Sequence, residues 1–411
     1  MIKDKKFLFN FSKILGAAFI AQIIPVLISP VISRIYSVED IGVQGVIFSI
    51  VGFCWIFSTL RYDNVIIIDR LINPIRNFIT VKKITVITSF FLTLIIILFI
   101  NQLSEYFNLN EPLVLLMVPL IVYINASYEL LIIYNNRVQN FDNIAKIKVF
   151  QSSISGIFQL VFGFMGLNYF GLILAPLISK FLPYFKSKLF RIFFIKPKLY
   201  KKDFILIHKY KKFPLFDLPS SLINNLSLQL PIILLASNYS LVISGAYFMT
   251  QRVLQIPITL FSHSFLEVFK ERICDPKNQF KLRKLMLDSF ILIFFISFVP
   301  FVLLFIFVDD LIVVFLGENW IMAAKFGKIL VPSLFFRFIS YPLSYIILLK
   351  QKQLINLIFN IISLAFVVIL FSSKIDVYSL VIKLSILFSL QSIIKILYSF
   401  SLTKNNSNIE I

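Results

Sequence analysis

The chain has 411 residues, of which 59% are hydrophobic and only 15% are charged, with a mean hydropathy of +0.90. A water-soluble protein of this length needs a larger polar surface and a disordered chain needs far fewer apolar residues, so the composition excludes both classes. The net charge is +20, from 40 Lys and Arg against 20 Asp and Glu. On a soluble protein such a charge would indicate a nucleic-acid partner, so the positions of the charges along the chain have to be considered.

Twelve apolar segments have the length of a membrane-spanning helix, because about 20 helical residues cross the ~30 Å hydrocarbon core. In chain order the predicted spans are residues 14–33, 41–60, 84–104, 112–128 with a short extension, 149–166, 169–185, two helices starting within 218–251, then 289–308, 331–349, 353–373 and 377–399. The first segment lacks a signal-peptide cleavage site and is followed by many others. The sequence therefore predicts an all-α integral membrane protein.

The positive charges fall mainly on one side of these predicted spans. If the N-terminus is cytoplasmic, 31 of the Lys and Arg residues lie in cytoplasmic segments, four in external segments and five within spans. Because cytoplasmic loops carry the excess of Lys and Arg, this distribution predicts cytoplasmic N- and C-termini. It also explains the net charge without nucleic acid, since the lysines would lie near anionic lipid headgroups of the membrane.

The longest polar segment, residues 186–212, lies in the middle of the chain and is strongly basic. It divides the sequence into two predicted six-helix lobes, residues 1–185 and 213–411. Both lobes have the same number of spans and the same orientation, so the repeat would be parallel, with a pseudo-two-fold axis along the membrane normal. Transporters built in this way place their site between the lobes, and we expect a central cavity there.

A short internal repeat supports this division. Tyr36–Ser37 precedes Gly42 at the turn into the second predicted helix, and Tyr239–Ser240 precedes Gly245 at the turn into the eighth. The spacing is identical in both places, although chance could produce one such match.

Catalytic and cofactor signatures are absent from the sequence: it has two histidines, no Gly-rich phosphate loop and no zinc or disulfide pattern of cysteines. We therefore expect neither an enzyme nor a bound metal or cofactor. Ionisable residues at membrane depth are costly and are functional candidates for that reason. The candidate cavity cations are Arg34, Arg61, Arg252, Arg337 and Lys383.

Each cation also has a structural interpretation. Arg34 and Arg61 flank their helices and could be interfacial anchors. Arg252 could pair with Glu129 or Asp217 and only hold helices together. Lys180 and Lys395, near the cytoplasmic ends of their spans, are expected to reach back to the headgroups.

Amides and acidic groups complete the candidate set. Prolines in the first, seventh and eighth predicted helices indicate bends, and the seventh helix also carries amides that could line a polar cavity or simply bond between helices. The candidate cavity amides are Asn224, Asn225 and Gln229. The candidate coupling residues are Glu129, Asp217, His263 and Glu267, the last two of which are four apart and share a helix face.

Two stretches resemble a known family. The segment PVISRIYSVEDIGVQGVIFSI at 30–50, followed by TLRYDNVII at 59–67, resembles the opening of Wzx-type polysaccharide flippases of the multidrug/oligosaccharidyl-lipid/polysaccharide (MOP) exporter superfamily. The segment FLGENWIMAAKFGKILVPSLFFRFISYPLSYIIL at 315–348 is similar to the Gly-Glu-x-Trp loop of the same family.

This resemblance implies two six-helix lobes around a cavity that opens alternately to each side of the bacterial inner membrane. It implies that an undecaprenyl-diphosphate-linked oligosaccharide is moved outward, for O-antigen or capsular polysaccharide synthesis. By similarity to lipid II flippases, Arg34, Arg61 and Arg252 would bind the diphosphate, for which the guanidinium fork is suited. It also implies a monomeric transport unit, with a polysaccharide polymerase and a chain-length regulator as partners.

Two other functions fit the residues less well. A drug or cation exporter of the same fold would need an acidic cavity, but few carboxylates lie within the predicted spans. A membrane polymerase or glycosyltransferase would need a sizeable external loop with catalytic groups, and the longest external segment, residues 309–328, is short.

Overall fold

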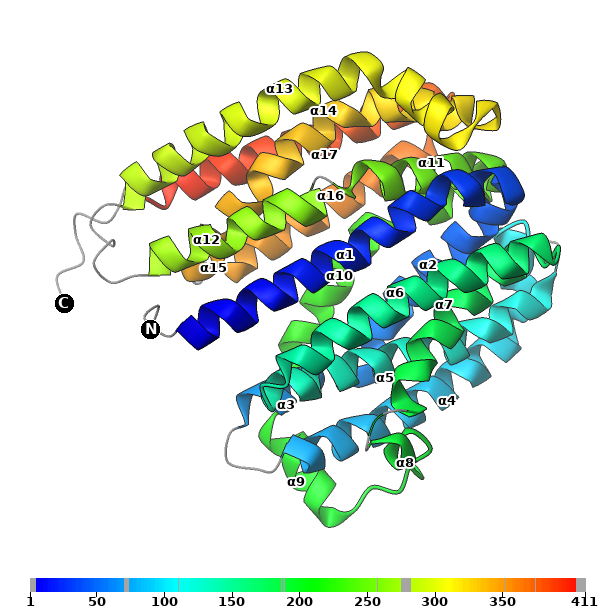
Figure 1. Ribbon diagram of the computed structural model, residues 1–411, viewed down its shortest axis with the longest axis vertical. Coiled ribbons are helices and arrows are strands. Elements are labelled where there is room, and N and C mark those ends of the chain that lie inside the picture. Colours follow the sequence, from blue (N-terminus) through cyan, green and yellow to red (C-terminus); the bar gives the residue numbers. More distant parts are fainter. Residues whose placement is uncertain are drawn as a thin grey trace. The chain divides into compact units, whose positions relative to one another are not determined.

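In the computed structural model, most of the described residues are helical, and none of them lies in a strand (Figure 1). The described residues are 5–69, 74–109, 111–185, 187, 189–256, 258–274, 282–350, 352–373 and 375–403. Each of the twelve predicted spans coincides with a helix or a pair of consecutive helices in these ranges. The chain divides into two compact units, Met1–Gly245 and Ala246–Ile411.

The first unit is built from seven long helices and several short ones. Its elements are α1 (Lys5–Ile35), α2 (Val38–Thr59), α3 (Asp63–Ile68), α4 (Pro74–Tyr106), the 3-10 turn η1 (Pro112–Leu116), α5 (Met117–Arg137), α6 (Phe141–Phe164), α7 (Asn168–Phe185), α8 (Phe190–Phe193), α9 (Lys201–Lys209), the π-turn η2 (Phe213–Asp217) and α10 (Leu218–Asn238). α1 packs along α6, and α2 packs against α4, α5, α7 and α10 (Figure 1).

The start of α2 shows how local sequence fixes a helix end. Ser37 is the N-cap: its hydroxyl accepts a hydrogen bond from the Asp40 backbone N–H at 3.0 Å, and the Asp40 carboxylate accepts one from the Ser37 backbone N–H, also at 3.0 Å. This capping box satisfies amides that a helix start leaves without partners. It allows a tight turn between α1 and α2, so these two spans run in opposite directions.

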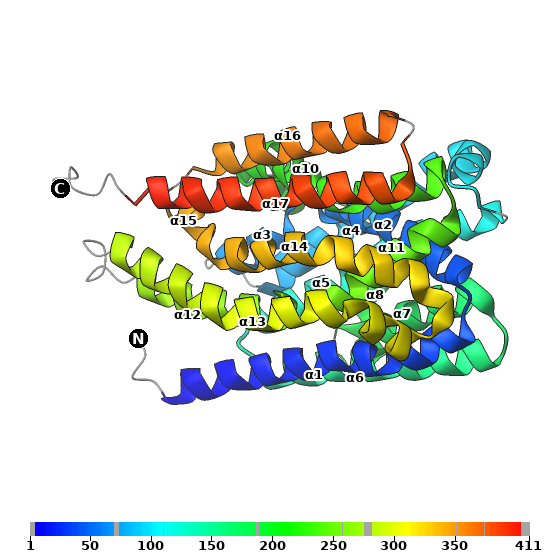
Figure 2. The same ribbon diagram turned by 90° about the horizontal axis from the view of Figure 1, so that it is seen from above.

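The second unit begins within α11 and contains the last five predicted spans. Its elements are α11 (Leu241–Leu254), the π-turn η3 (Ile258–Ser262), α12 (His263–Cys274), α13 (Leu282–Leu316), η5 (Glu318–Trp320), α14 (Ile321–Leu343), α15 (Tyr345–Leu349), α16 (Gln353–Ser372) and α17 (Val377–Ser401). α14 lies between α13 and α17 and packs on both, as Figure 2 shows. The eighth predicted span is broken near Pro257, which is itself outside the described residues.

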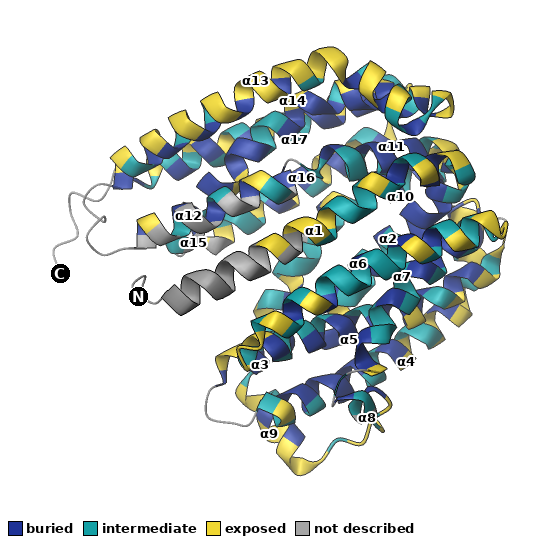
Figure 3. Cartoon of the chain, viewed as in Figure 1, coloured by how far each residue is buried: buried dark blue, intermediate teal, exposed yellow. Residues whose placement is uncertain are grey.

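The length of these helices and the exposure of their apolar side chains are those of membrane-spanning helices. Among the described residues, eight helices are long and apolar enough to cross a membrane, or nine if the bent α10 segment counts as one span. Most of α13 leaves its apolar side chains exposed, as the outer face in Figure 3 shows, and Phe295 and Val314 are 68% and 77% exposed. Such a surface is stable only in contact with lipid tails. The protein is therefore a multi-pass membrane protein.

The division into units comes later in the chain than the predicted start of the second lobe at residue 213. α10 packs extensively on α2, and the basic segment 186–212 packs on α4, so both belong to the first unit. The six-plus-six organisation by spans remains a prediction.

Candidate functional site

Arg61 stands in a strained turn at the end of α2. Leu60 caps α2 in the left-handed region (φ 48°), and Arg61 follows with φ 62°. Non-glycine residues rarely adopt such values, so the surroundings must hold them there. Thr59 does this by accepting a hydrogen bond from the Arg61 backbone N–H at 3.3 Å and donating one to the Asp63 carboxylate at 2.7 Å.

The Arg61 side chain forms an ion pair with Asp217, two of the candidate residues that the sequence did not link. Arg61 Nε donates to Asp217 Oδ2 at 2.7 Å, and Asn64 Nδ2 donates to the same oxygen at 3.3 Å. Asp217 belongs to the π-turn before α10, so the pair fixes the start of α10 to the end of α2. The side chains are 24% and 39% exposed, which leaves the pair accessible to a competing anion.

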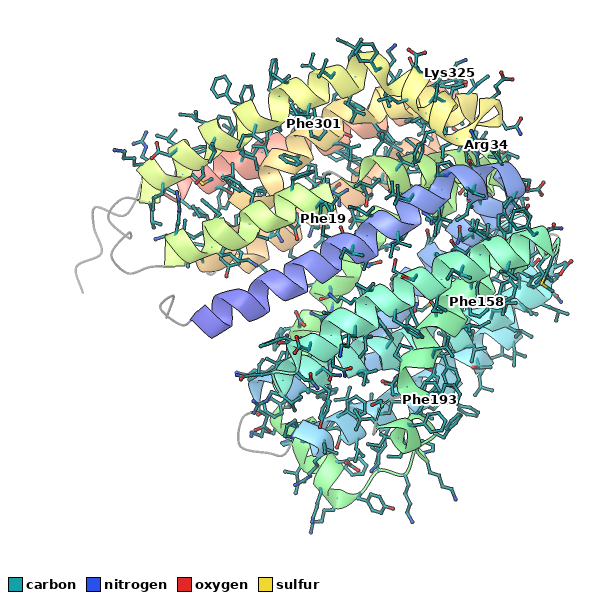
Figure 4. All side chains as sticks on the ribbon, in the orientation of Figure 1. Phe19, Arg34, Phe158, Phe193, Phe301 and Lys325 are labelled. Carbon is teal, nitrogen blue, oxygen red and sulfur yellow. The ribbon has the colours of Figure 1, made fainter. Side chains whose placement is uncertain are left out.

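Arg34 lies at the other end of α2. It is exposed near the end of α1, where its Nη1 donates to the Pro30 carbonyl at 2.7 Å (Figure 4). The 22 residues of α2 separate it from Arg61, a length of about 33 Å at the rise of an α-helix. One diphosphate cannot contact both arginines in this structure.

Arg252 is half-buried near the end of α11 in the second unit. It forms no hydrogen bond or ion pair with the described residues of its own unit. Beside it, Gln255 Nε2 donates to Gln251 Oε1 at 3.1 Å, which adds polar atoms to the same helix turn.

The remaining predicted cations differ in their exposure. Arg337 is half-buried on α14, whereas Lys383 is exposed on α17. The side chains of His263 and Glu267, two of the predicted coupling residues, lie outside the described residues, as does that of Asn224.

Two of the predicted amides on α10, Asn225 and Gln229, have described side chains that are half-buried in the first unit. Gln229 lies against α2, where its Nε2 would stand 3.0 Å from a Cβ placed on Gly52. Asn225 Oδ1 is inaccessible and has no hydrogen-bond partner among the described residues. An unpaired buried amide oxygen is costly, so it indicates a polar group or a water that the site would accept.

A cavity of about 290 Å³ lies within the first unit between α2, α5 and α7. Its polar lining consists of Asn125, Glu129 and Lys180. Lys180 Nζ donates to Asn125 Oδ1 at 2.8 Å, whereas the Glu129 carboxylate forms no hydrogen bond or ion pair with any described residue and faces the cavity.

The expectation that Lys180 reaches back to the lipid headgroups is wrong. The ammonium instead binds an amide on the neighbouring helix, since Asn125 lies within its reach. The same expectation for Lys395, in the second unit, is also wrong. Its Nζ donates to Asn360 Oδ1 at 3.2 Å, and Gln391 Nε2 lies 3.4 Å from that oxygen. Asn125 and Asn360 are site residues that the sequence reading missed, because single asparagines within spans carry no motif.

Comparison with known proteins identifies the family of this chain. A family model described as "polysaccharide biosynthesis protein" matches residues 31–325. The chain belongs to this family. A search of curated protein sequences finds no match.

Solved structures place this polysaccharide biosynthesis protein in a known fold. The lipid II flippase MurJ, in an inward closed conformation, matches with a TM-score of 0.71 at 15% identity, over 96% of this chain and 87% of that chain. An inward-facing MATE multidrug transporter of the MOP superfamily matches with a TM-score of 0.66 at 14% identity, over 97% and 96%. A Vibrio cholerae MATE transporter gives 0.61 at 14% identity, also over 97% and 96%. The resemblance to Wzx-type flippases is thereby confirmed for the family and the fold.

The internal repeat of this family member has a structural counterpart. A Cβ on Gly42 would lie 2.0 Å from the Leu241 carbonyl oxygen, and a Cβ on Gly245 would lie 2.2 Å from the Val38 carbonyl oxygen. Leu241 stands in the same place relative to Gly245 as Val38 does relative to Gly42. The contact is therefore reciprocal, as a two-fold axis through the crossing requires, and only glycine permits two helix starts to approach so closely.

Proposed function

We propose that the protein is a flippase, and not an enzyme, that moves an undecaprenyl-diphosphate-linked oligosaccharide across the bacterial inner membrane by alternating access. The family and the fold support a lipid-linked flippase or a related MOP transporter. The repeat unit would serve O-antigen or capsular polysaccharide synthesis. We assign the arginines to substrate binding. A diphosphate needs charge-assisted hydrogen-bond donors, and the hydrocarbon core of the membrane provides none.

The observation that carries this proposal is Arg252. It is a half-buried guanidinium within a predicted span, and it has no carboxylate partner among the described residues of its own unit. A cation at membrane depth is costly, so a site that keeps one without a protein counter-ion is suited to an anionic ligand. Arg337 is a second half-buried cation of the same unit and would extend this site.

The other two arginines would act at different stages of transport. Arg61 is at the end of the first unit that the charge distribution assigns to the cytoplasm, and its ion pair with Asp217 would open when a diphosphate competes for the guanidinium. Arg34, at the opposite end of α2, would contact the diphosphate during release. This order follows from the ~33 Å that separates them.

Glu129 is the residue that we assign to energy coupling. Its carboxylate faces the cavity of the first unit and has no described partner, so it can gain or lose a proton or bind a cation without breaking a contact. The neighbouring Lys180 lines the same cavity, and its ammonium donates a hydrogen bond to Asn125 and not to the Glu129 carboxylate.

Replacement of Arg252 tests the proposal. In a host that depends on this gene for its surface polysaccharide, we expect Arg252→Ala to lower the glycan about 10- to 100-fold, the effect of losing charge-assisted hydrogen bonds worth about 1.5–3 kcal/mol. Lipid-linked oligosaccharide should accumulate while the protein still inserts. Arg252→Lys should restore part of the activity, and Arg283→Ala, at an exposed arginine of α13, is the matched control. Wild-type glycan output from Arg252→Ala would contradict the assignment.

A drug or cation exporter is the second candidate, because MATE transporters share the fold and Glu129 supplies an acidic cavity. Export of a cationic dye by reconstituted protein, abolished by Glu129→Gln and unaffected by Arg252→Ala, would favour it over the flippase.

A further inference from the structure

The basic segment between the predicted lobes is folded against the first unit. Asp203 of α9 is buried and accepts three hydrogen bonds: from Lys83 Nζ at 2.8 Å, from Thr80 Oγ1 at 2.6 Å and from the Tyr200 backbone N–H at 2.8 Å. Burial raises the pKa of the Asp203 carboxyl, but these hydrogen bonds outweigh it and lower the pKa below its usual value. Asp203 is the only acidic residue of the segment 186–212, and its charge is neutralised internally.

Further contacts fix the inner face of α9. Leu206 is buried, the Tyr62 hydroxyl donates to the Ile207 carbonyl at 3.1 Å, and Lys209 Nζ lies 3.5 Å from Asp69 Oδ2. The Tyr62 and Asp69 contacts come from the residues immediately before and after α3, so α9 cannot turn about its axis while they hold.

α8 is held to the same end of the unit by an aromatic cluster. Lys82 is fully buried, with its Nζ bonded to Ser127 Oγ and 3.9 and 4.5 Å from the ring centroids of Tyr123 and Phe193. Such a cation–π site is strong when it is desolvated. Figure 4 shows Phe193, the last residue of α8, at the edge of the first unit. α8, as well as α9, is thus docked on this unit.

The outer face of α9 combines lysines with exposed apolar side chains. Lys201 and Lys202 are exposed, and Phe204 and Ile205 are 56% and 61% exposed. Lys201 and Ile205 are four residues apart and share one face of the helix. In water such a face would be unfavourable, because two large apolar side chains would remain exposed to solvent and would gain no free energy from burial.

The depth of α9 is set by α4, to which it is bound. Apart from Ile75 at its start, the large apolar residues that α4 exposes begin at Phe90 and Phe91, which are 60% and 59% exposed and suit lipid tails. Lys83, the contact to α9, precedes Phe90 by seven residues, or about 10 Å along the helix. α9 therefore lies beyond the hydrocarbon layer, at the level of the lipid headgroups.

We propose that the outer face of α9 binds the anionic phospholipid headgroups of the adjacent leaflet, which the charge distribution assigns to the cytoplasmic side. Lys201 and Lys202 contact phosphate, while Phe204 and Ile205 insert among the first methylenes of the acyl chains. Charge complementarity favours anionic over zwitterionic lipid, because the face carries no free carboxylate. This surface does not depend on what the protein transports.

The test uses full-length protein in nanodiscs of phosphatidylcholine with increasing phosphatidylglycerol. Ile205→Cys, in a background of Cys54→Ser and Cys274→Ser, carries a polarity-sensitive fluorophore. We expect its emission to shift to the blue as phosphatidylglycerol increases. Lys201→Gln with Lys202→Gln should raise the midpoint of this titration about tenfold, since each lysine near an anionic surface strengthens binding several-fold.

The matched control replaces two other exposed basic residues, Arg283→Gln with Lys284→Gln at the start of α13, and should leave the midpoint unchanged. Raising the salt concentration should remove the phosphatidylglycerol-dependent shift in the protein that keeps its lysines. An emission that is equal in both lipids, insensitive to salt, or altered as much by the control pair overturns the proposal. Because the readout is spectroscopic, loss of transport in any variant does not bear on it.

Discussion

A carboxylate that faces a cavity inside a membrane-spanning unit is exposed to changes in proton and ion concentration in a way that a paired carboxylate is not. Glu129 has this position, and the cation nearest in the cavity lining, Lys180, is bound to Asn125. At the scale of single residues, the two acidic candidates therefore differ in their pairing. Glu129 has no described ion pair, whereas the carboxylate of Asp217 is paired with Arg61.

We expect Glu129→Gln to remove the dependence of transport on a proton or cation gradient while the fold is retained, because the carboxylate makes no described contact that the amide would lose. Transport by membrane vesicles with and without an imposed pH gradient measures this. Glu105→Gln, at an exposed acid near the end of α4, is the control. A gradient dependence that survives Glu129→Gln would assign coupling to another residue.

The buried ion pair of Lys83 and Asp203 allows a prediction of stability. Asp203→Asn leaves Lys83 buried without a counter-ion, so we expect a loss of about 3–5 kcal/mol in the free energy of unfolding. Asp288→Asn, at an exposed position of α13, should change it by less than about 0.5 kcal/mol. Denaturant unfolding in detergent measures both values.

The same pair sets a pH dependence. The pKa of Asp203 is lowered in the folded protein, so its contribution is fully present above the unfolded value of about 3.9 and is lost as the pH falls through the folded value. Thermal unfolding of the wild-type protein should therefore show this loss only in strong acid, and Asp203→Asn should not show it. A loss that begins near neutral pH would contradict the pairing.

At the scale of helices, the crossing of α2 and α11 is the contact most sensitive to side-chain size. An added Cβ on Gly42 or Gly245 would meet a backbone carbonyl, which cannot move as a side chain can. We expect Gly42→Ala and Gly245→Ala to destabilise the protein to a similar extent, by about 1–3 kcal/mol, because their contacts are reciprocal.

Thermal unfolding in detergent measures this effect. Gly16→Ala is the control, since a Cβ there meets no atom within 4 Å, and helix propensity then favours alanine. Equal melting temperatures for Gly42→Ala and Gly16→Ala would show that the two helix starts do not pack as closely as described.

At the scale of the whole molecule, the charge distribution predicts which ends of the helices are cytoplasmic. Lys325, exposed at the start of α14, should be external, and Lys202 on α9 should be cytoplasmic. In a cysteine-free background, we expect Lys325→Cys to react with a membrane-impermeant maleimide in intact cells, and Lys202→Cys to react only after permeabilisation. The reverse pattern would invert the topology and with it the direction of the proposed transport.

Much of the fold could be predicted from the sequence because a helix that crosses a bilayer requires a contiguous run of apolar residues. A run of about 20 apolar residues has few alternatives to a spanning helix, and the lysines that flank it predict its orientation. The Gly42 and Gly245 spacing was also visible, since a repeat preserves local sequence. None of these inferences requires knowing which helices are neighbours.

The candidate site was less predictable because its contacts join distant parts of the chain. Only tertiary packing pairs Arg61 with Asp217, binds Lys180 to Asn125 and leaves Arg252 without a described partner in its own unit. It also turned the basic segment 186–212 from a predicted linker into a docked part of the first unit, through Asp203. The sequence by itself determined that the chain is built from apolar helices of membrane-spanning length and that its net charge is positive, which are properties of local composition. The tertiary structure decided which charges meet, because an ion pair depends on distances of a few ångströms that no local pattern encodes.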